Sequence, residues 1–335
     1  MKYDIIVLGS GPGGYVTAIR ASQLGFKVAV IEKENLGGVC LNWGCIPTKA
    51  LLKSAQVFEY LKHASDYGLT VSSFDKDFGA VINRSRSVAD GMSKGVQFLM
   101  KKNKIDVIEG FGKLKPGKKV EVKAADGKVT EYSADHIIIA TGARSRELPN
   151  LPQDGTKVIG YRQAMTLPAQ PKKMIVVGSG AIGVEFASFY NAMGTEVTIV
   201  EFMPNIVPVE DEDISKQFER SLKKAGITIM TNSSVERIDT SGSGVKAYVK
   251  TAKGEEVLEA DILLSAVGIK TNIENIGLEE VGIATDRDKI LVNDYCQTNI
   301  PGYYAIGDVT PGQALAHVAS AEGILCVEKI KGLHV

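Results

Sequence analysis

The sequence predicts an α/β fold with two successive parallel-sheet domains, each carrying a small antiparallel β-meander. Two observations predict it: a strand, a glycine-rich turn and a helix follow one another near the N-terminus, and the same unit recurs in the second half of the chain. The length of 335 residues also suits two domains of about 150 residues each.

The first unit has the spacing of a dinucleotide-binding turn. An apolar run typical of a buried parallel strand precedes the segment Gly9–Gly14, and a helical pattern follows it. Gly9 permits the tight turn, Gly11 lets backbone amides approach a pyrophosphate, and Gly14 allows the helix to pack closely on the strand. Glu32 ends the next strand, where its carboxylate can accept hydrogen bonds from ribose hydroxyls.

The second unit repeats these positions. Gly178, Gly180 and Gly183 have the spacing of Gly9, Gly11 and Gly14, and Glu201 again ends the following strand. Glycine turns that merely connect elements would not repeat all four positions, so we interpret both units as Rossmann-like nucleotide sites. An acid suits an unphosphorylated adenosine ribose, and residues 201–208 contain no arginine, which predicts NAD rather than NADP.

Later segments complete the two domains. Strand patterns at 136–139, 262–267 and 303–306 each lead to a glycine, and we expect each to end at a sheet edge near a cofactor. An exposed Asp308, following the third of these strands, is placed to bind a polyol chain such as ribityl.

Two hairpins and the domain boundaries follow from the same duplication. Residues 119–133 and 245–257 alternate around glycine turns and are predicted to be the hairpins of the two meanders. We predict a discontinuous first domain, 1–145 with 272–335, and a second domain, 146–271.

Composition excludes several classes of protein. The 39 basic and 39 acidic residues cancel, so no charged field indicates nucleic acid or a membrane surface. Apolar runs stay far below the ~20 residues of a membrane helix, and the N-terminus has no signal-peptide pattern, so we expect a cytoplasmic protein. Four cysteines are too few for a disulfide scaffold.

Cys40 and Cys45 are predicted to be a redox-active pair. They follow the first nucleotide unit directly and precede a helical pattern over 50–61, so they lie near a helix N-terminus, where the macrodipole favours thiolate. One distorted helical turn can close their separation, and Pro47 removes an amide that would make the turn regular. The alternative is two buried cysteines acting as small hydrophobic residues, which the glycines, Pro47 and Lys49 around them disfavour.

The other cysteines and the histidines carry no such signal. Cys296 and Cys326 lack this setting, and we predict that both are buried hydrophobic residues. None of the four histidines has metal-ligand spacing with the cysteines, so we predict no metal.

These segments together resemble the pyridine nucleotide–disulfide oxidoreductase family, and within it the dihydrolipoamide dehydrogenases. The most specific segment is Gly37–Lys49, and the resemblance covers the whole chain. Supporting segments are Gly178–Phe189, Gly307-Asp308 and Leu315-Ala316-His317.

The resemblance assigns FAD to the first domain and NAD to the second. For FAD it implies contacts with Gly9, Gly11, Gly13, Gly14, Glu32, Lys33, Gly38, Val39, Lys49, Gly112, Thr141, Gly142, Asp308 and Ala316. For NAD it implies contacts with Gly178, Gly180, Ile182, Gly183, Glu201, Val235 and Gly268. It also implies that Lys49 forms a buried ion pair with Glu185, which would be costly to break. After Gly268 this chain departs from the family pattern of Arg, Pro and Asn.

The reaction that the resemblance implies carries two electrons from a dihydrolipoyl dithiol to NAD⁺. The dithiol attacks a Cys40–Cys45 disulfide at Cys40, the Cys45 thiolate reduces the flavin, and the flavin passes hydride to NAD⁺. Cys40, Cys45, Lys49 and Glu185 are the implied catalytic residues. The implied partners are a 2-oxo acid dehydrogenase complex and a second copy of the full-length chain.

The family continues into a third, dimer-forming domain that supplies a His–Glu base, and this sequence stops at Val335. We therefore expect a truncated chain that binds FAD but oxidises dihydrolipoamide poorly, because a positioned base is typically worth about 10²–10⁴-fold.

Three other reductases and a non-enzymatic protein are the alternatives. Glutathione reductase is disfavoured by Glu201 without neighbouring arginines, and mercuric reductase would need further cysteines. A small thioredoxin reductase would carry its cysteine pair in the second domain. A flavin-binding redox module without NADH-dependent turnover remains the alternative outside enzymes.

Overall fold

The computed structural model describes residues 2–335 and divides them into two compact units. The first unit contains the described part of Met1–Asn42, together with Ala89–Arg144 and Lys270–Val335, and the second contains Trp43–Val88 and Ser145–Ile269. Residues 43–88 thus group with the second unit, although the sequence analysis placed them in the first domain. The assignment of one cofactor to each domain stays a prediction.

A parallel sheet forms the centre of the first unit, in the order β3-β2-β1-β6-β19. The strands at its centre contain buried apolar runs, with Ile5, Ile6 and Val7 of β1 fully buried, as expected for a strand covered on both faces of the sheet, whereas the edge strand β3 is largely exposed. The strands are β1 (Lys2–Leu8), β2 (Val28–Glu32), β3 (Asp106–Glu109), β6 (Val129–Ile139) and β19 (Tyr303–Ala305). All five carboxyl ends therefore lie along one edge of the sheet.

Strand β6 belongs to the parallel sheet and to a meander at the same time. Its first residues pair antiparallel with β5 (Lys119–Lys123), which pairs with β4 (Phe111–Lys115), and its last residues pair parallel with β1 and β19. This confirms the predicted hairpin at 119–133. Leu114 and Val120 of the meander join Ile6 and Ile137 in one core, so the meander packs on the sheet that it extends.

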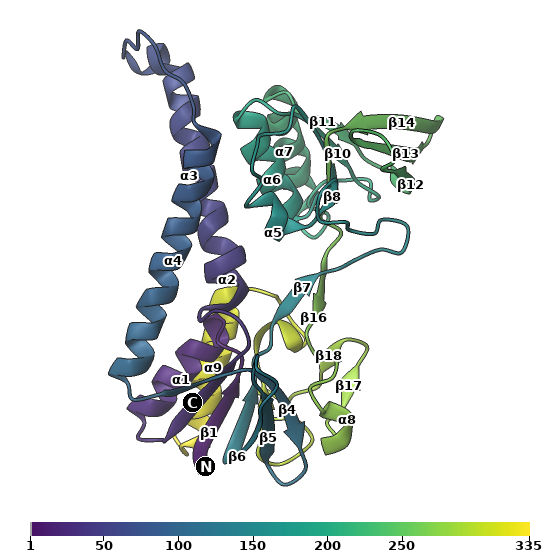
Figure 1. Ribbon diagram of the computed structural model, residues 1–335. Helices are drawn as coiled ribbons and strands as arrows, with labels where there is room; N and C mark the ends of the chain where they lie inside the picture. The colour runs from purple at the N-terminus through teal and green to yellow at the C-terminus, as the bar shows by residue number, and fades with distance from the viewer. Residues whose placement is uncertain (1) are drawn as a thin grey trace. The chain divides into compact units, whose positions relative to one another are not determined.

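Two helices of the first unit, α1 (Pro12–Gln23) and α9 (Ala316–Ile330), lie side by side (Figure 1). Their contact is close because a Cβ atom on Gly323 would lie 1.8 Å from Thr17 Oγ1. Arg20 of α1 forms an ion pair with Glu328 of α9, with Nη2 and Oε1 2.5 Å apart. The other elements here are α2 (Gly38–Trp43), α8 (Leu278–Val281), β17 (Thr285–Asp286), β18 (Lys289–Ile290) and the 3₁₀ helix η2 (Gly307–Val309). Helix α4 (Phe78–Lys102) belongs to the first unit from Ala89 onward and to the second unit before it.

The second unit has the same strand order, β11-β10-β9-β15-β8, and all its pairs are parallel. The strands are β8 (Val158–Ile159), β9 (Lys173–Val177), β10 (Glu196–Val200), β11 (Thr228–Met230) and β15 (Ile262–Ser265). Its helices are α3 (Cys45–Lys62), η1 (Ala64–Tyr67), α5 (Tyr161–Ala164), α6 (Ala181–Ala192) and α7 (Glu212–Lys224).

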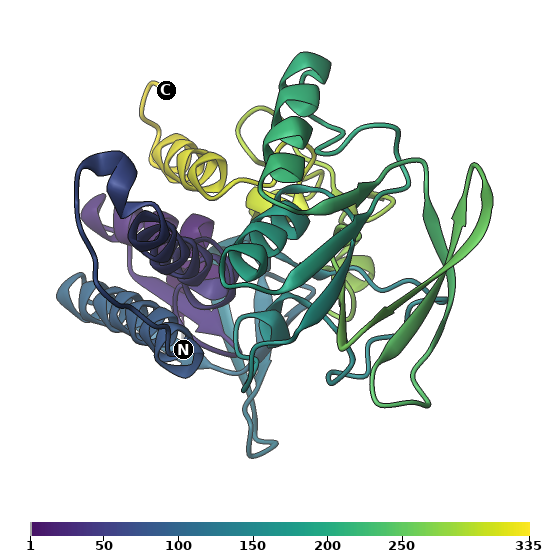
Figure 2. The same ribbon diagram turned by 90° about the horizontal axis from the view of Figure 1, so that it is seen from above.

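A second meander completes this unit, with β12 (Ser234–Asp239), β13 (Val245–Thr251) and β14 (Gly254–Ala260). Its green strands lie to one side of the teal parallel sheet (Figures 1 and 2). The hairpin of β13 and β14 confirms the one predicted at 245–257.

The two sheets differ in where their fifth strand comes from. In the first unit β19 arrives from the C-terminal segment, whereas in the second unit β8 precedes β9 in the chain. The place of a strand is thus set by its pairing with β6 or β15 rather than by chain order. Strand β8 could not be predicted from the sequence, because a two-residue strand is too short for a periodic pattern.

Helix formation around the cysteines begins earlier than predicted. The helix expected from residue 50 begins at Cys45, and a further short helix, α2, contains Cys40. Pro47 fits the first turn of α3 because the N–H groups there have no partner within the helix.

Two short connecting strands pair with each other, β7 (Ala143–Ser145) and β16 (Ile269–Thr271). Beside them Arg144 donates to both carboxylate oxygens of Glu274, at 3.0 and 2.9 Å, and to Asn272 Oδ1 at 2.9 Å. Lys270 lies 2.8 Å from the same carboxylate. These two cations hold the pKa of Glu274 at about 2. None of the helices in residues 2–335 combines the length and apolar composition needed to cross a membrane.

We predict that Glu274→Gln lowers the free energy of unfolding at pH 7 by about 1 kcal/mol, the upper range for an exposed ion pair. The folded pKa lies below the ordinary value of 4.5, so the stabilisation is complete above pH 4.5 and is lost as the pH falls towards 2. Urea unfolding should therefore show a smaller difference between variant and parent at pH 3 than at pH 7. Glu279→Gln is the control, since this exposed side chain has no ion pair within residues 2–335. An equal loss for the two variants at pH 7 would contradict the prediction.

Candidate functional site

The first glycine turn joins β1 to α1, and its glycines serve two different purposes. A Cβ atom on Gly9, which has a φ of +100°, would lie 2.3 Å from Ala140 O, and one on Gly14 would lie 2.0 Å from Gly9 O. Both positions are therefore closed to any side chain. A Cβ atom on Gly11 would meet nothing within 4 Å, so this glycine faces open space at the start of α1.

The second turn, between β9 and α6, repeats this arrangement contact by contact. A Cβ atom on Gly178 would lie 2.4 Å from Ala266 O, and one on Gly183 would lie 2.0 Å from Gly178 O. Gly180 again has nothing within 4 Å. The repeated spacing in the sequence thus corresponds to a repeated structure.

Both turns suit a pyrophosphate. Helices α1 and α6 have 12 residues each and begin after a glycine whose position lacks a side-chain cap, and neither has an acidic residue in its first turn. The amide groups of each first turn therefore keep their hydrogen-bonding capacity, and the helix dipole adds positive potential. An anion fits at each helix N-terminus, as the predicted FAD and NAD sites require.

The two acids at the ends of β2 and β10 bind the glycine turns through serines. Glu32 Oε2 accepts hydrogen bonds from Ser10 N at 3.0 Å and Ser10 Oγ at 2.5 Å. Glu201 Oε2 accepts from Ser179 N at 2.8 Å and Ser179 Oγ at 2.6 Å. The repeated position of Ser10 and Ser179 in the two glycine turns is the sequence signal that could have predicted these contacts.

The remaining acceptor capacity of the two acids differs. Glu32 Oε1 accepts from two backbone amides, Lys33 N and Glu34 N, whereas Glu201 Oε1 accepts from Met203 N alone. A carboxylate offers about four lone-pair positions, so Glu201 keeps one for a ribose hydroxyl and Glu32 keeps none. A ribose at Glu32 would have to replace a present donor, and the rotatable Ser10 hydroxyl can leave most easily.

Several predicted FAD residues gather around the first turn. A Cβ atom on Gly38 would lie 2.7 Å from Gly11 Cα, and a Cβ atom on Gly9 would lie 3.3 Å from Thr141 Cα. Gly112 packs against Leu8, the residue before the turn, because a Cβ atom on Gly112 would lie 2.3 Å from Leu8 Cδ1. Val39 is in α2 next to Gly38, and Gly142 follows Thr141 in the left-handed conformation.

The other residues predicted to bind FAD in the first unit lie near its C-terminal segment or at its surface. A Cβ atom on Gly13 would lie 3.2 Å from Ala319 Cβ, which brings the turn against α9, the helix that Ala316 begins. Asp308, expected to be exposed, is half-buried instead. Burial raises the pKa of its carboxyl, and Lys289 opposes this shift. Lys33 is exposed beyond Glu32.

The predicted NAD residues lie less closely together. Ile182, in the first turn of α6, is 37% exposed, and Gly268 is exposed after β15. Val235 is buried in the core with Val177 and Val200, and its carbonyl accepts a hydrogen bond from Asn150 Nδ2 at 2.7 Å. The Val235 side chain therefore packs in the protein core, whereas Ile182 and Gly268 are exposed to solvent.

Cys40 and Cys45 form a disulfide. Cys45 is the first residue of α3 and is exposed, whereas Cys40 is half-buried in α2. No side chain caps the start of α3, so its amide groups can stabilise a Cys45 thiolate. Cys296 and Cys326 are free and buried, as predicted, and burial raises the pKa of both thiols.

Lys49 and Glu185 form the expected ion pair, but it is not buried. The atoms Nζ and Oε1 are 2.5 Å apart, and the side chains are 62% and 30% exposed. The pair is exposed because α3 and α6 pack along one side, and the two long side chains meet at the margin of this contact rather than inside it.

The pair α3 and α6 is also held at its other end. Lys62 Nζ donates to Ala192 O at 2.9 Å, and Lys76 Nζ donates to Met193 O, so two cations cap the carboxyl end of α6. Lys49 and Glu185 are each the fifth residue of their helix. The start of α3, with Cys45, and the start of α6, with the second glycine turn, therefore lie at the same end of the helix pair.

Trp43, the residue before Gly44, carries two arginines over its ring. The Cζ atoms of Arg86 and Arg162 lie 4.3 and 5.2 Å from the ring centroid. These cation–π contacts fix the indole of Trp43, which lies between Cys40 and Cys45 in the sequence. These contacts could not be predicted from the sequence, because the two arginines are distant from Trp43 in the chain.

A model of the pyridine nucleotide-disulphide oxidoreductase family matches residues 3–323. The chain belongs to this family. This confirms the resemblance, the predicted fold class and the two cofactors, since members of the family use FAD and NAD(H).

Relatives named dihydrolipoyl dehydrogenase share much of the sequence. That of Rhizobium etli is 50% identical, over 99% of this chain and 72% of the relative, and that of Zymomonas mobilis is 47% identical, over 98% and 71%. Among solved structures, LpdA from Mycobacterium tuberculosis has a TM-score of 0.93 at 30% identity, over 100% of this chain and 73% of that one.

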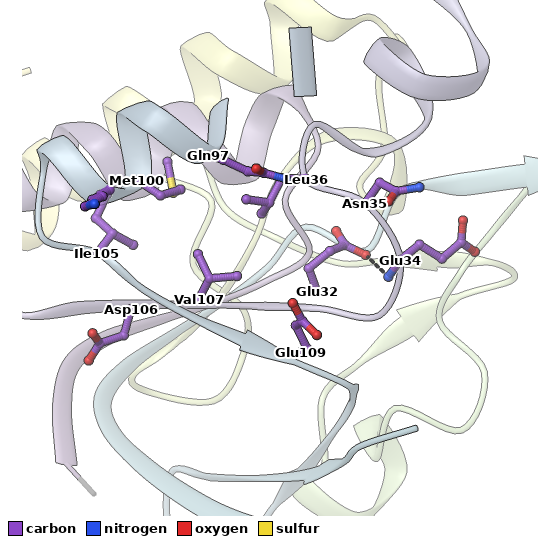
Figure 3. Close-up of a pocket in the computed structure, with 11 residues that line it drawn as sticks. Glu32, Glu34, Asn35, Leu36, Gln97, Met100, Ile105, Asp106, Val107 and Glu109 are labelled. Carbon is purple, nitrogen blue, oxygen red and sulfur yellow. Dashed lines mark hydrogen bonds between the residues drawn. The ribbon is translucent and has the colours of Figure 1, made fainter. Parts of the chain in front are cut away.

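A pocket of about 520 Å³ opens in the first unit of this family member, beside Glu32 (Figure 3). Among the residues predicted to bind FAD, only Glu32 lines it, and the glycine turn does not. The other lining residues are Glu34, Asn35, Leu36, Gln97, Met100, Lys101, Ile105, Asp106, Val107 and Glu109. We assign no ligand to this pocket.

Two substitutions in one turn separate packing from binding. Gly14→Ala should lower the stability of the apoprotein by about 2 kcal/mol, because the methyl group collides with Gly9 O. Gly11→Ala should change stability by less than about 0.5 kcal/mol but weaken FAD binding at least about tenfold, because its methyl group enters the open space. Urea unfolding and FAD titration check both, and FAD binding unaffected by Gly11→Ala would contradict the assignment of this turn.

Proposed function

We propose that the chain is a flavin disulfide oxidoreductase of the dihydrolipoyl dehydrogenase type, which transfers two electrons from a dihydrolipoyl dithiol to NAD⁺. The observation that carries the proposal is the Cys40–Cys45 disulfide at the uncapped start of α3, in a chain with two dinucleotide turns. The relatives named dihydrolipoyl dehydrogenase support the choice of dithiol.

Disulfide exchange at Cys40 opens the reaction. A substrate thiolate attacks Cys40 Sγ, a sulfur–sulfur bond forms between them, and the Cys40–Cys45 bond breaks with its electron pair on Cys45. The second substrate thiol, after losing its proton, attacks the substrate sulfur of this mixed disulfide. A cyclic disulfide leaves, and Cys40 is released as a thiolate.

The start of α3 explains why Cys45 is the leaving sulfur. Thiols of lower pKa leave faster, and the free amides and dipole at this helix N-terminus favour the Cys45 thiolate. Lys49 lies one turn further along the same helix, so its ammonium group is on the same face as Cys45 and favours the same thiolate. Glu185 holds this ammonium group in place at 2.5 Å.

The two nucleotide turns would hold the cofactors. The first turn with Gly11, Glu32 and Asp308 would bind FAD, and the second turn with Gly180 and Glu201 would bind NAD. Bound FAD and NAD supply the electron acceptance and the hydride chemistry that no side chain can provide.

The partners follow from the substrate. We propose that the dithiol is carried by a 2-oxo acid dehydrogenase complex, that full-length protein pairs with a second copy, and that the protein works in the cytoplasm. The balanced charge of 39 basic and 39 acidic residues gives no reason to expect nucleic acid or a membrane as a partner.

Anaerobic titration of the yellow holoprotein tests the electron path. We expect a dithiol such as dithiothreitol to produce a long-wavelength absorption band from the Cys45 thiolate next to the flavin. Cys45→Ser should abolish this band, because no thiolate remains at the start of α3. NADH should still bleach the flavin of this variant, since that step needs only the nucleotide sites.

The matched control is Cys296→Ala, which removes a buried free thiol and should leave the band intact. A band of parental strength in Cys45→Ser would show that another group contacts the flavin. If NADH bleaches the flavin of the parent and no band ever appears with dithiol, the chain is instead a flavin-binding module with bystander cysteines.

A further inference from the structure

The turn after β19 is fixed by a carboxylate from α9. Gly307, with a φ of +72°, begins the 3₁₀ helix η2 and precedes Asp308. Its N–H donates to Glu322 Oε2 at 2.6 Å. A Cβ atom on Gly307 would lie 3.0 Å from Ala319 Cβ, so the turn rests directly on α9.

The carbonyl groups of Gly307 and Asp308 are also bound by protein groups. Gly307 O accepts hydrogen bonds from Thr310 N at 2.9 Å and Thr310 Oγ1 at 2.8 Å, and Asp308 O accepts from Lys289 Nζ at 2.6 Å. Within residues 2–335 the carboxylate of Asp308 has no hydrogen bond. Protein groups thus bind the amide of Gly307 and the carbonyls of Gly307 and Asp308, and the Asp308 carboxylate is left as an acceptor.

Glu322 occupies this position at an electrostatic cost. Burial raises the pKa of its carboxyl, and the nearby charge of Asp308 raises it further, although the Gly307 N–H opposes both. Burial likewise raises the pKa of Asp308. Packing alone does not require two such acids, and acids with a pKa raised by burial are enriched at functional sites.

We infer that Glu322 is a positioning residue for flavin binding, which holds Gly307 so that the Asp308 carboxylate meets the hydroxyl groups of a polyol chain. The inference rests on the proposed function, because it takes FAD as the ligand of Asp308. Glu322 does not touch the cofactor itself but acts through the turn. Hydrogen bonds to charged groups are among the stronger ones in proteins, so loss of the bond between the Gly307 N–H and Glu322 should measurably weaken FAD binding.

The test measures release of FAD from the holoprotein on dilution, followed by the fluorescence of free FAD. Glu322→Ala should weaken FAD binding about 10- to 100-fold, as expected for the loss of a charge-assisted hydrogen bond. Glu322→Gln keeps an acceptor for the Gly307 N–H and should stay within about threefold of the parent. Glu322→Asp is shorter by one methylene group and should lie between them, and it replaces the alanine variant if that one does not fold.

Glu328→Ala is the matched control, because Glu328 belongs to the same helix and binds Arg20 of α1 rather than the turn. It should leave FAD binding within about twofold even if the protein is less stable. In an Asp308→Asn background, Glu322→Ala should add little, since the two residues act on one ligand contact.

The inference is overturned if Glu322→Ala holds FAD as the parent does, if its effect equals that of Glu328→Ala, or if the effects of Glu322→Ala and Asp308→Asn add. A parent chain that takes up no FAD would overturn the proposed function, and with it this inference. If the parent binds FAD and Glu322→Ala binds it equally well, the inference is wrong but the proposed function is unaffected.

Discussion

The close approach of a helix to the strand before it is the constraint on which both nucleotide units depend. A Cβ atom on Gly14 or Gly183 would lie 2.0 Å from the carbonyl oxygen of the first glycine of its turn, so only glycine allows α1 and α6 to begin where they do. That placement directs the free amides of each first turn into open space beside Gly11 and Gly180. The anion sites are therefore a consequence of backbone packing rather than of charged side chains.

The same physical principle serves the cysteine pair. Helix α3 begins at Cys45 without a side-chain cap, so a third helix N-terminus can stabilise a negative charge, which in the proposed reaction would be the Cys45 thiolate. The ion pair of Lys49 with Glu185 and the lysine contacts at the end of α6 fix α3 and α6 together. Cys45 and the second glycine turn therefore lie at the starts of two helices that pack against each other.

Carboxylates organise the turns in both units. Glu32 and Glu201 bind the serine of their own glycine turn, and Glu322 binds the amide of Gly307. In each case the acid first fixes the protein backbone. One acceptor position at Glu201 and the carboxylate of Asp308 would be available to a ligand without the loss of a present hydrogen bond, whereas a ligand at Glu32 would have to displace a donor such as the Ser10 hydroxyl.

The sequence by itself determined the duplicated turn, the acids at the strand ends, the two hairpins and the special setting of Cys40 and Cys45, because these signals lie within one or two neighbouring elements. Tertiary structure alone decided that β8 and β19 take equivalent places in their sheets, that the ion pair of Lys49 is exposed, and that Glu322 reaches Gly307. These features depend on contacts between segments distant in the chain, and no local spacing records them.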